Sequence, residues 1–219
     1  MRPKTTKILT LSMLLLFLLI SCVSASTTIT IPYDKFNTTS ITYYQTDKTY
    51  TMFEAKITPS VTFNTSNTNA VIVLALTNAN NESRDGIVFK IFSSLAQVFI
   101  MTDSVYSDSK IAEIGGDVGW KNAIGDTWLI TYVNGKLSIG NSTDKDALIG
   151  NYALGDFTLN YIQASDGSAT PQSVTSGSVY ITIDDSMLQT QTLVYAWIPV
   201  IVTFAMLGMV LALVKKLSV

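Results

Sequence analysis

Hydrophobic and polar residues alternate along much of residues 27–184, which is the pattern of β-strands with one buried face. In residues 51–58 (TMFEAKIT), the apolar side chains of Phe53 and Ile57 alternate with charged ones. Residues 70–77 (AVIVLALT) are almost wholly apolar, as in a central strand that is covered on both faces. Further strands are predicted at residues 27–31, 87–92, 96–101, 128–133, 136–140, 157–163 and 178–184. Because no segment here has a helical period, the pattern predicts one all-β domain, an antiparallel β-sandwich.

The clearest hairpin lies in residues 126–141 (DTWLITYVNGKLSIGN). Two β-rich runs flank Asn134-Gly135, the dipeptide that favours a two-residue turn with both residues at positive φ. Trp128 and Tyr132 then lie on one face of the first strand. A tryptophan in a central strand of a sandwich belongs more often to the core than to a ligand site, so we interpret both side chains as core.

Residues 1–25 are predicted to be a secretory signal peptide. Basic residues precede an apolar run at residues 8–20, which is short for a membrane span. Small residues at alternate positions favour cleavage after Ala25. As an alternative, residues 19–22 (LISC) resemble the bacterial lipobox, in which Cys22 is lipidated and becomes the N-terminus.

The C-terminal region predicts a single membrane span. Residues 193–214 carry no charge and are long enough to cross the hydrocarbon of a bilayer as a helix. We assign residues 188–214 to this helix and a short lead-in, and residues 215–219 to a cytoplasmic tail. Lys215 and Lys216 follow the span, so the positive-inside rule predicts a type I protein with its preceding domain outside. The polar end KKLSV argues against a GPI signal.

Small residues in this span suggest a second contact besides the lipid bilayer. Gly208 and Ala212 are four residues apart, a spacing that lets two membrane helices approach closely. Lateral self-association is therefore a candidate property, beside the simpler interpretation that these are ordinary small residues of a span.

Charge and composition exclude several functions. Residues 26–187 contain all sixteen acidic side chains and nine basic ones, a net charge of −7, which argues against a nucleic-acid partner. The chain has no histidine, and no cysteine remains after cleavage at Ala25. Histidine-dependent nucleophilic triads, disulfides and thiolate zinc sites are excluded on this basis. We predict no catalytic residues, no metal site and no cofactor.

The order of strands and the hairpin motif resemble a known superfamily. The motif is W-x-I-x-Y-x-N-G-x-L-x-x-G at residues 128–140, and the resemblance covers about residues 50–184. It is similar to the jelly rolls of the concanavalin A-like lectins and laminin-G domains. The resemblance implies a jelly roll whose relatives often bind glycans on a concave face or on rim loops. The Glu-x-Asp-x-Glu strand of the superfamily's glycosidases and the calcium-binding set of legume lectins are absent from this sequence.

One loop and four sequons are the remaining candidate sites. The glycine-rich residues 115–126 (GGDVGWKNAIGD) carry Trp120, with Asp117 and Asn122 beside it, as candidate ligand-binding residues. A plug over the end of the sandwich is the alternative role of Trp120. The N-x-[ST] sequons are candidate glycosylation sites at Asn37, Asn64, Asn81 and Asn141.

Three functions remain after these exclusions. The first is a non-catalytic, membrane-anchored protein with a structural or interaction role on a cell surface or virion envelope, with surface-coat proteins as partners. The second is a glycan-binding adhesion module. The third is a hydrolase whose site the sequence does not identify.

Overall fold

The computed structural model describes residues 26–115, 122–168 and 172–217. These residues fall into two compact units. Ser26–Asp185 forms a β-sandwich, and the second unit contains a long C-terminal helix. The predicted signal peptide and Cys22 lie outside the described residues, as does the end of the predicted tail.

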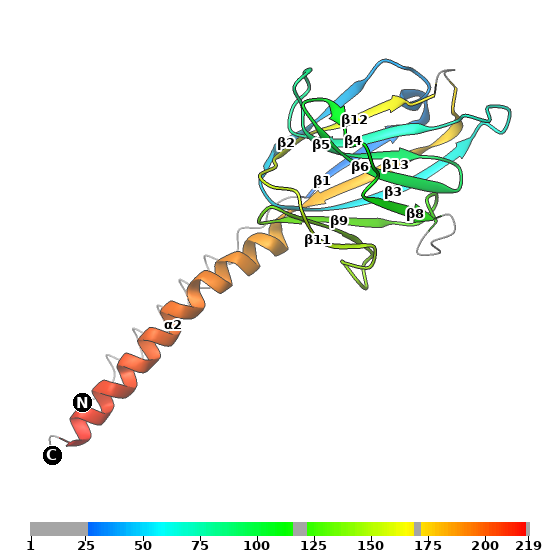
Figure 1. The fold of residues 1–219 in the computed structure, drawn as a ribbon. Coiled ribbons are helices and arrows are strands. Elements are labelled where there is room, and N and C mark those ends of the chain that lie inside the picture. The colour runs from blue at the N-terminus through cyan, green and yellow to red at the C-terminus, as the bar shows by residue number, and fades with distance from the viewer. Residues whose placement is uncertain (1–25, 116–121, 169–171, 218–219) are drawn as a thin grey trace. The chain divides into compact units, whose positions relative to one another are not determined.

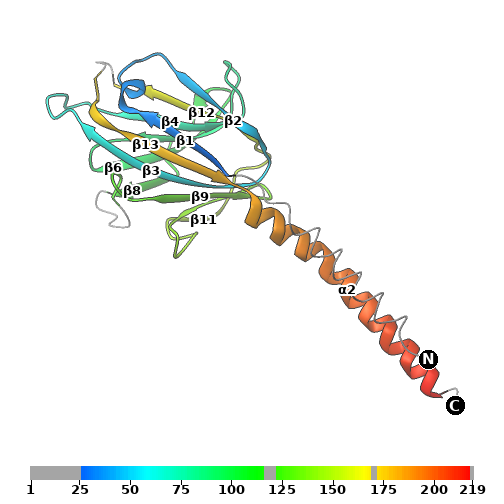
Figure 2. The ribbon, with the colours of Figure 1, turned by 180° about the vertical axis from the view of Figure 1, so that it is seen from behind.

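Six strands form the first sheet, and every neighbouring pair is antiparallel. In spatial order they are β1 (Thr27–Pro32), β13 (Val174–Asp184), β3 (Phe53–Phe63), β9 (Trp128–Val133), β10 (Lys136–Gly140) and β11 (Ile149–Ala153). Figure 2 shows β1, β13, β3 and β9 side by side. The first and the last strand of the domain are thus neighbours.

The second sheet is seven-stranded and also antiparallel. In spatial order it contains β2 (Thr42–Tyr50), β12 (Leu159–Asp166), β4 (Ile72–Thr77), β5 (Gly86–Ile91), β6 (Leu95–Thr102) and β7 (Val105–Tyr106), and β8 (Ala112–Gly115) also pairs with β6. A short 3-10 helix, η1 (Tyr33–Phe36), follows β1 and leads to this sheet. The predicted all-β sandwich is therefore confirmed (Figure 1).

The core lies between the two sheets, where alternate residues of each strand meet. The Trp128 ring packs on Phe89 of the opposite sheet, with 5.7 Å between ring centroids, and both side chains are fully buried. The predicted central strand β4 is buried on both faces. Its Ile72 faces the main core, while Ala75 belongs to a small second cluster with Val88. A second apolar layer therefore lies on the outer face of the seven-stranded sheet.

The β9–β10 hairpin has the predicted register and turn. Val133 pairs with Lys136, and Asn134 and Gly135 between them have φ values of 50° and 75°. Positive φ at both central residues belongs to the turn type that matches the twist of paired strands. Trp128 is 0% exposed, so its assignment to the core is confirmed.

Four strands were not expected from the hydrophobic pattern: β2, β7, β8 and β11. β11 is an edge strand and is mostly exposed, and β2 is also an edge strand, so neither needs strict alternation. β1 and β2, which precede the residues 50–184 that carry the resemblance, supply one strand to each sheet.

The helix α2 spans Ser186–Leu217. Its segment Val194–Leu211 has a mean hydropathy of 2.2 and no buried side chains, so length and composition make it a candidate membrane span. Pro199 lies inside the helix, and the Thr203 hydroxyl donates a hydrogen bond to its carbonyl at 2.8 Å. Only Asp185 separates β13 from α2 along the chain.

Candidate functional site

The loop predicted to bind a ligand is described only in part. Asp117 and Trp120 lie outside the described residues, and their roles stay predictions. Asn122 is exposed, and its main chain has structural contacts. Its N–H donates to the Asp126 carboxylate at 2.9 Å, and its carbonyl accepts from the Trp128 indole N–H at 3.4 Å. The main chain of Asn122 thus satisfies the one polar group of the core tryptophan.

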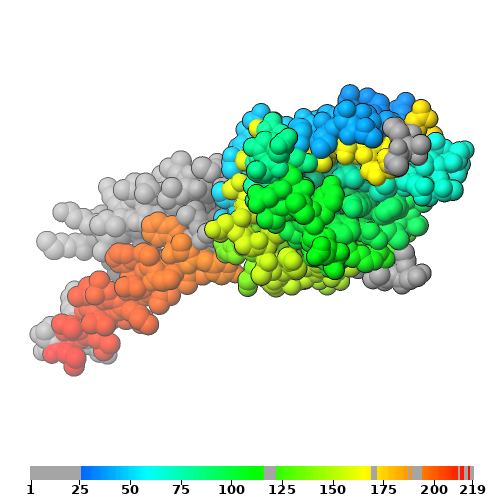
Figure 3. All heavy atoms as spheres, turned by 45° about the horizontal axis from the view of Figure 1, so that its top comes forward, coloured from blue at the N-terminus to red at the C-terminus, as the bar shows by residue number. Residues whose placement is uncertain are grey.

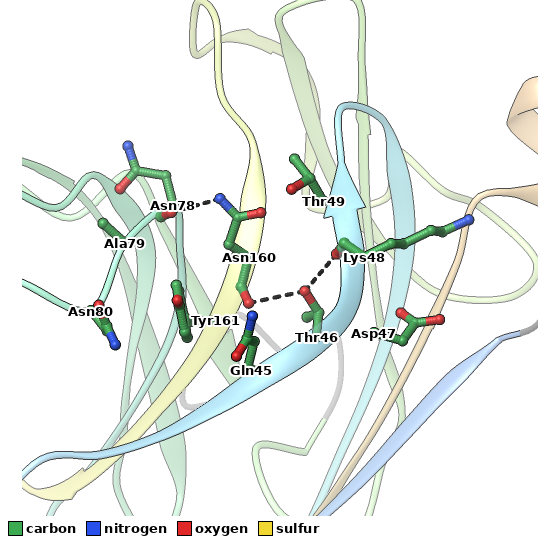
Figure 4. A pocket seen from close by; sticks show the side chains of 10 residues that line it. All are labelled: Gln45, Thr46, Asp47, Lys48, Thr49, Asn78, Ala79, Asn80, Asn160 and Tyr161. Carbon is green, nitrogen blue, oxygen red and sulfur yellow. Dashed lines mark hydrogen bonds between the residues drawn. The ribbon is translucent and has the colours of Figure 1, made fainter.

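A different site emerges on the seven-stranded sheet, at the edge formed by β2. A cleft of about 440 Å³ lies between residues 45–49 of β2, residues 78–80 of the β4–β5 loop, and Asn160 and Tyr161 of β12 (Figure 4). The space-filling view shows these blue-to-cyan, teal and yellow segments meeting on one face (Figure 3). Three segments distant in sequence therefore build the site together.

An irregularity in strand pairing creates this cleft. Tyr161 pairs with Gln45 and Leu159 pairs with Tyr50, so four residues of β2 face a single residue, Asn160, on β12. Such bulges bend a strand and redirect its side chains, and they are frequent beside binding sites. β2 bows away from β12 here, and the space between them is the cleft.

Hydrogen bonds hold the bulge open. The buried Thr46 hydroxyl bonds both the Lys48 carbonyl, at 2.7 Å, and the Asn160 carbonyl, at 2.9 Å. The Asn160 amide in turn donates to the Asn78 carbonyl at 2.7 Å. Since Thr46 is only 6% exposed, these bonds are shielded from water. The wall of the cleft is therefore fixed before any ligand arrives.

Several polar groups at the cleft have no partner within the described part of the chain. The side chains of Gln45, Thr49 and Asn80 are exposed and form no hydrogen bond there, and neither does the Tyr161 hydroxyl. The Tyr161 ring is half-buried and packs edge-on against Tyr43, with centroids 6.4 Å apart. The cleft thus presents two amides, two hydroxyls and an aromatic ring to a ligand.

The two charged residues of β2 at the cleft are engaged elsewhere. The Lys48 ammonium donates to the Asp185 carboxylate at 2.8 Å, and Figure 4 shows its side chain extending away from the cleft. Asp47 accepts hydrogen bonds from the hydroxyls of Thr27 and Tyr50. The cleft is therefore electrically almost neutral, although the domain is acidic.

Burial and hydrogen bonding shift two pKa values in this network. Burial raises the pKa of Tyr50 to about 12, and the nearby Asp47 carboxylate adds to the increase. Partial burial acts to raise the pKa of Asp47 as well, but the bonds from Thr27 and Tyr50 together bring it below its ordinary value. At neutral pH, Tyr50 therefore stays neutral and Asp47 ionised. The bond from the Thr27 hydroxyl to the Asp47 carboxylate joins β1 to β2.

Among the described residues that line the cleft, Asp47 is the one carboxylate, whereas most glycosidases use a pair of carboxyl groups. Nor do the described residues contain a group of three or more Asp, Glu, His or Cys side chains that could hold a metal ion.

The four sequons differ in how their amides are used. Asn37 and Asn64 donate through Nδ2 to the carbonyls of Val174, at 2.7 Å, and Gln172, at 3.1 Å. Asn81 and Asn141 accept hydrogen bonds through Oδ1, and in the described residues their Nδ2 atoms donate none. Since a glycan is attached at Nδ2, Asn81 and Asn141 are the sequons with that atom available. Glycosylation itself stays a prediction for all four.

The predicted helix contact is only partly visible. A Cβ added at Gly208 would have no described atom within 4 Å, so this position is open. The side chain of Ala212 lies outside the described residues. Self-association through this pair stays a prediction.

Sequence reasoning missed the cleft, although one signal was present. Residues 78–81 (NANN) are rich in asparagine, as is typical of turns, and Asn78, Ala79 and Asn80 also line the cleft. Gln45 and Tyr161 carry no local signal, because only the register of β2 against β12 brings them together.

Comparisons with known proteins agree with the fold. No protein-family model and no curated protein matches the chain. Among solved structures, the VIP36 exoplasmic/lumenal domain in its Ca²⁺/Man-bound form is 10% identical, with a TM-score of 0.46 over 73% of this chain and 80% of that one. Sheep galectin-11 in complex with glycerol is 7% identical, with a TM-score of 0.39 over 66% and 97% of the two chains.

A Bacillus licheniformis β-glucanase is also similar, at 12% identity and a TM-score of 0.39 over 65% of each chain. The structural neighbours thus include concanavalin A-like lectins, which the sequence resemblance named, together with glycosidase and glucanase jelly rolls. Likenesses this distant concern the fold alone, and the ligand of this chain does not follow from them.

Proposed function

We propose that this chain is a membrane-anchored surface protein whose β-sandwich is a non-catalytic module that binds carbohydrate in the β2–β12 cleft. The observation that carries the proposal is the set of unpartnered amides around the half-buried ring of Tyr161. An amide offers a donor and an acceptor at once, as each sugar hydroxyl does. The aromatic ring adds an apolar surface with a polar tip.

The cleft supports binding more than hydrolysis. Its single carboxylate, Asp47, already accepts two hydrogen bonds, and a second carboxyl group does not line the cleft. The fixed wall around Thr46 suits recognition, because less conformational entropy is lost when a preformed site binds its ligand.

A structural role on a cell or virion surface is the second candidate. The favouring observation is the short connection between the sandwich and the apolar part of α2. Ser186–Leu193 are the only residues between Asp185 and the start of the apolar segment at Val194. Such a short connection limits how far the domain can reach and suits a protein that supports a surface coat.

The proposed topology has residues 1–25 as a cleaved signal, residues 26–187 outside, and residues 215–219 in the cytoplasm. The apolar segment of α2 and the two lysines after it support this arrangement. Protease added to intact cells is expected to remove the sandwich and leave a C-terminal tag protected. Loss of the tag with the sandwich retained would reverse the topology.

Carbohydrate binding is tested with the full-length protein in detergent micelles on a panel of neutral and acidic glycans. Tyr161→Ala is expected to weaken binding about tenfold or more, the scale of a central aromatic contact. The matched control is Tyr180→Ala, because Tyr180 is 48% exposed on the other sheet. Equal binding by Tyr161→Ala and the wild type, or no glycan binding by the wild type, would refute the proposal.

A further inference from the structure

Arg84 is a cation without a carboxylate partner in an acidic domain. Within the described residues, five lysines form ion pairs: Lys35, Lys48, Lys56, Lys110 and Lys145. Arg84 forms none, although the domain carries a net charge of −7. Its charge is therefore available to an external group.

The Arg84 side chain is nevertheless held in place. Its Nε donates to the Gln163 side-chain oxygen at 3.0 Å, and Nη1 donates to the Asn81 carbonyl at 2.8 Å. Its guanidinium lies over the ring of Tyr43, at 5.9 Å from the centroid. Gln163 is only 2% exposed, so its amide is a fixed acceptor. Much of the rotamer entropy of the arginine is lost before any ligand binds.

Two of the five guanidinium N–H groups are used in this way, which leaves three without a partner in the described chain. Both Nη2 hydrogens and one Nη1 hydrogen are among these three, so the end of the guanidinium opposite Nε keeps donors for a ligand. A guanidinium edge matches a carboxylate in a bidentate arrangement, with charge-assisted hydrogen bonds stronger than neutral ones. The geometry therefore favours a carboxylate over a neutral hydroxyl at this position.

Arg84 is continuous with the cleft. Gln163, which holds it, is two residues from Tyr161 on the same face of β12, a rise of about 7 Å. Tyr43, which lies under the guanidinium, also packs against Tyr161. Asn80 of the cleft and Arg84 lie on the same loop, between β4 and β5. A ligand longer than one sugar can leave the cleft along β12 and meet the arginine.

The same face of the sheet carries a second cation on aromatic rings. The Lys90 ammonium lies 4.7 Å from the centroids of both Phe99 and Tyr106. Phe99 pairs with Val88, two residues from Lys90, and Val88 belongs to the apolar cluster on the outer face of this sheet. Within the described residues, neither Arg84 nor Lys90 forms an ion pair, so this face favours a ligand that carries negative charge.

We propose that Arg84 binds the carboxylate of an acidic sugar, so that the ligand of the cleft is a carboxylated glycan such as a uronic-acid polymer. This inference rests on the proposed function, and it adds the class of ligand. Asn80, Tyr161 and Gln45 bind the neutral hydroxyls, and Arg84 selects the acidic residue next to them.

The test compares oligogalacturonate with its methyl ester, which has the same sugar backbone without the charge. Full-length protein is produced in a host without N-glycosylation, so that Asn81 beside Arg84 is unmodified, and is assayed in detergent micelles. The acid form is expected to bind at least tenfold more tightly than the ester. Arg84→Gln is expected to remove this preference and leave ester binding unchanged.

Two further variants complete the design. Lys136→Gln removes an equal charge from β10 of the other sheet, where Lys136 is exposed, and it is expected to change neither affinity. Arg84→Lys keeps the positive charge and the aliphatic part of the side chain. It therefore controls for the case in which Arg84→Gln does not fold. It is expected to weaken binding of the acid form several-fold, because an ammonium does not form the bidentate contact.

The outcomes separate the two proposals. Binding of neutral glycans without any preference for the acid form, or an acid preference that survives Arg84→Gln, overturns the role of Arg84 and leaves the proposed function standing. Dextran sulfate gives a further control. If it binds as tightly as oligogalacturonate, and Lys136→Gln weakens its binding as much as Arg84→Gln does, the role of Arg84 is also overturned, because the attraction is then a general one for polyanions. Binding of no glycan overturns both proposals.

Discussion

The β9–β10 hairpin and the β2–β12 pair are both antiparallel, and both carry a tyrosine, yet the two tyrosines have opposite roles. Tyr132 is 2% exposed, and its hydroxyl bonds the Gly155 carbonyl and the Phe157 N–H. Tyr161 is half-buried, with an unpartnered hydroxyl at the edge of a cleft.

Register explains the difference. The hairpin pairs residue by residue from its turn onward, so each alternate side chain enters the core. The β2–β12 ladder is interrupted by a bulge, and the polar residues of the bulge line an open space. Regular strand pairing therefore places Tyr132 in the core, whereas the bulge leaves Tyr161 at the edge of the cleft.

Trp128→Ala is expected to be the most damaging change. It removes a fully buried indole that packs on Phe89 and leaves a cavity, at a cost of about 3–5 kcal/mol in the free energy of unfolding. Urea unfolding of the full-length protein measures the loss. A loss below about 1 kcal/mol would mean that the hairpin face is not core.

The raised pKa of the buried Tyr50 predicts that the protein becomes less stable at alkaline pH. This pKa rises from 10.0 to about 12 on folding, so the unfolded chain ionises first and stability is lost as pH rises from about 10 to 12. The loss approaches about 2–3 kcal/mol at the upper end. Urea unfolding between pH 9 and 12 measures it, with Tyr50→Phe as the comparison.

In Tyr50→Phe, the part of the alkaline loss due to this residue is expected to disappear, while the ionisation of the other tyrosines remains. An identical pH profile for both proteins would show that Tyr50 ionises equally in the folded and unfolded states.

Tyr132→Phe isolates the hydroxyl of the hairpin tyrosine. The ring stays, but the buried N–H of Phe157 and the Gly155 carbonyl each lose a partner, at an expected cost of about 1–3 kcal/mol. Thermal unfolding measures the change. The matched variant Tyr161→Phe removes an unpartnered hydroxyl, so it is expected to leave the melting temperature unchanged; equal losses in both would contradict the contrast.

Thr46→Val tests whether the bulge depends on its hydrogen bonds. The substitution keeps the shape and removes the bonds to Lys48 and Asn160, with an expected loss of about 0.5–1.5 kcal/mol. Glycan binding should fall with it, because the cleft wall is no longer fixed. Unchanged binding together with reduced stability would show that the hydrogen bonds of Thr46 are not needed for glycan binding.

Local pattern was sufficient for much of this protein. The pattern of apolar and polar residues predicted nine of the strands. Asn134-Gly135 predicted the hairpin register, because a two-residue turn fixes which residues face each other. The uncharged run before Lys215 and Lys216 likewise predicted a helix able to cross a membrane. Each of these features depends on residues that are close in sequence.

The cleft and the position of Arg84 were decided only by the tertiary structure. β2 was missed because an edge strand is free of strict alternation, and its bulge arises from pairing with a strand more than a hundred residues later. Gln163 is buried on β12, yet it lies where it can orient Arg84 from the β4–β5 loop. Such contacts join residues far apart in the chain, and their geometry is set by how the sheet pairs and packs, which a local pattern of side chains does not encode.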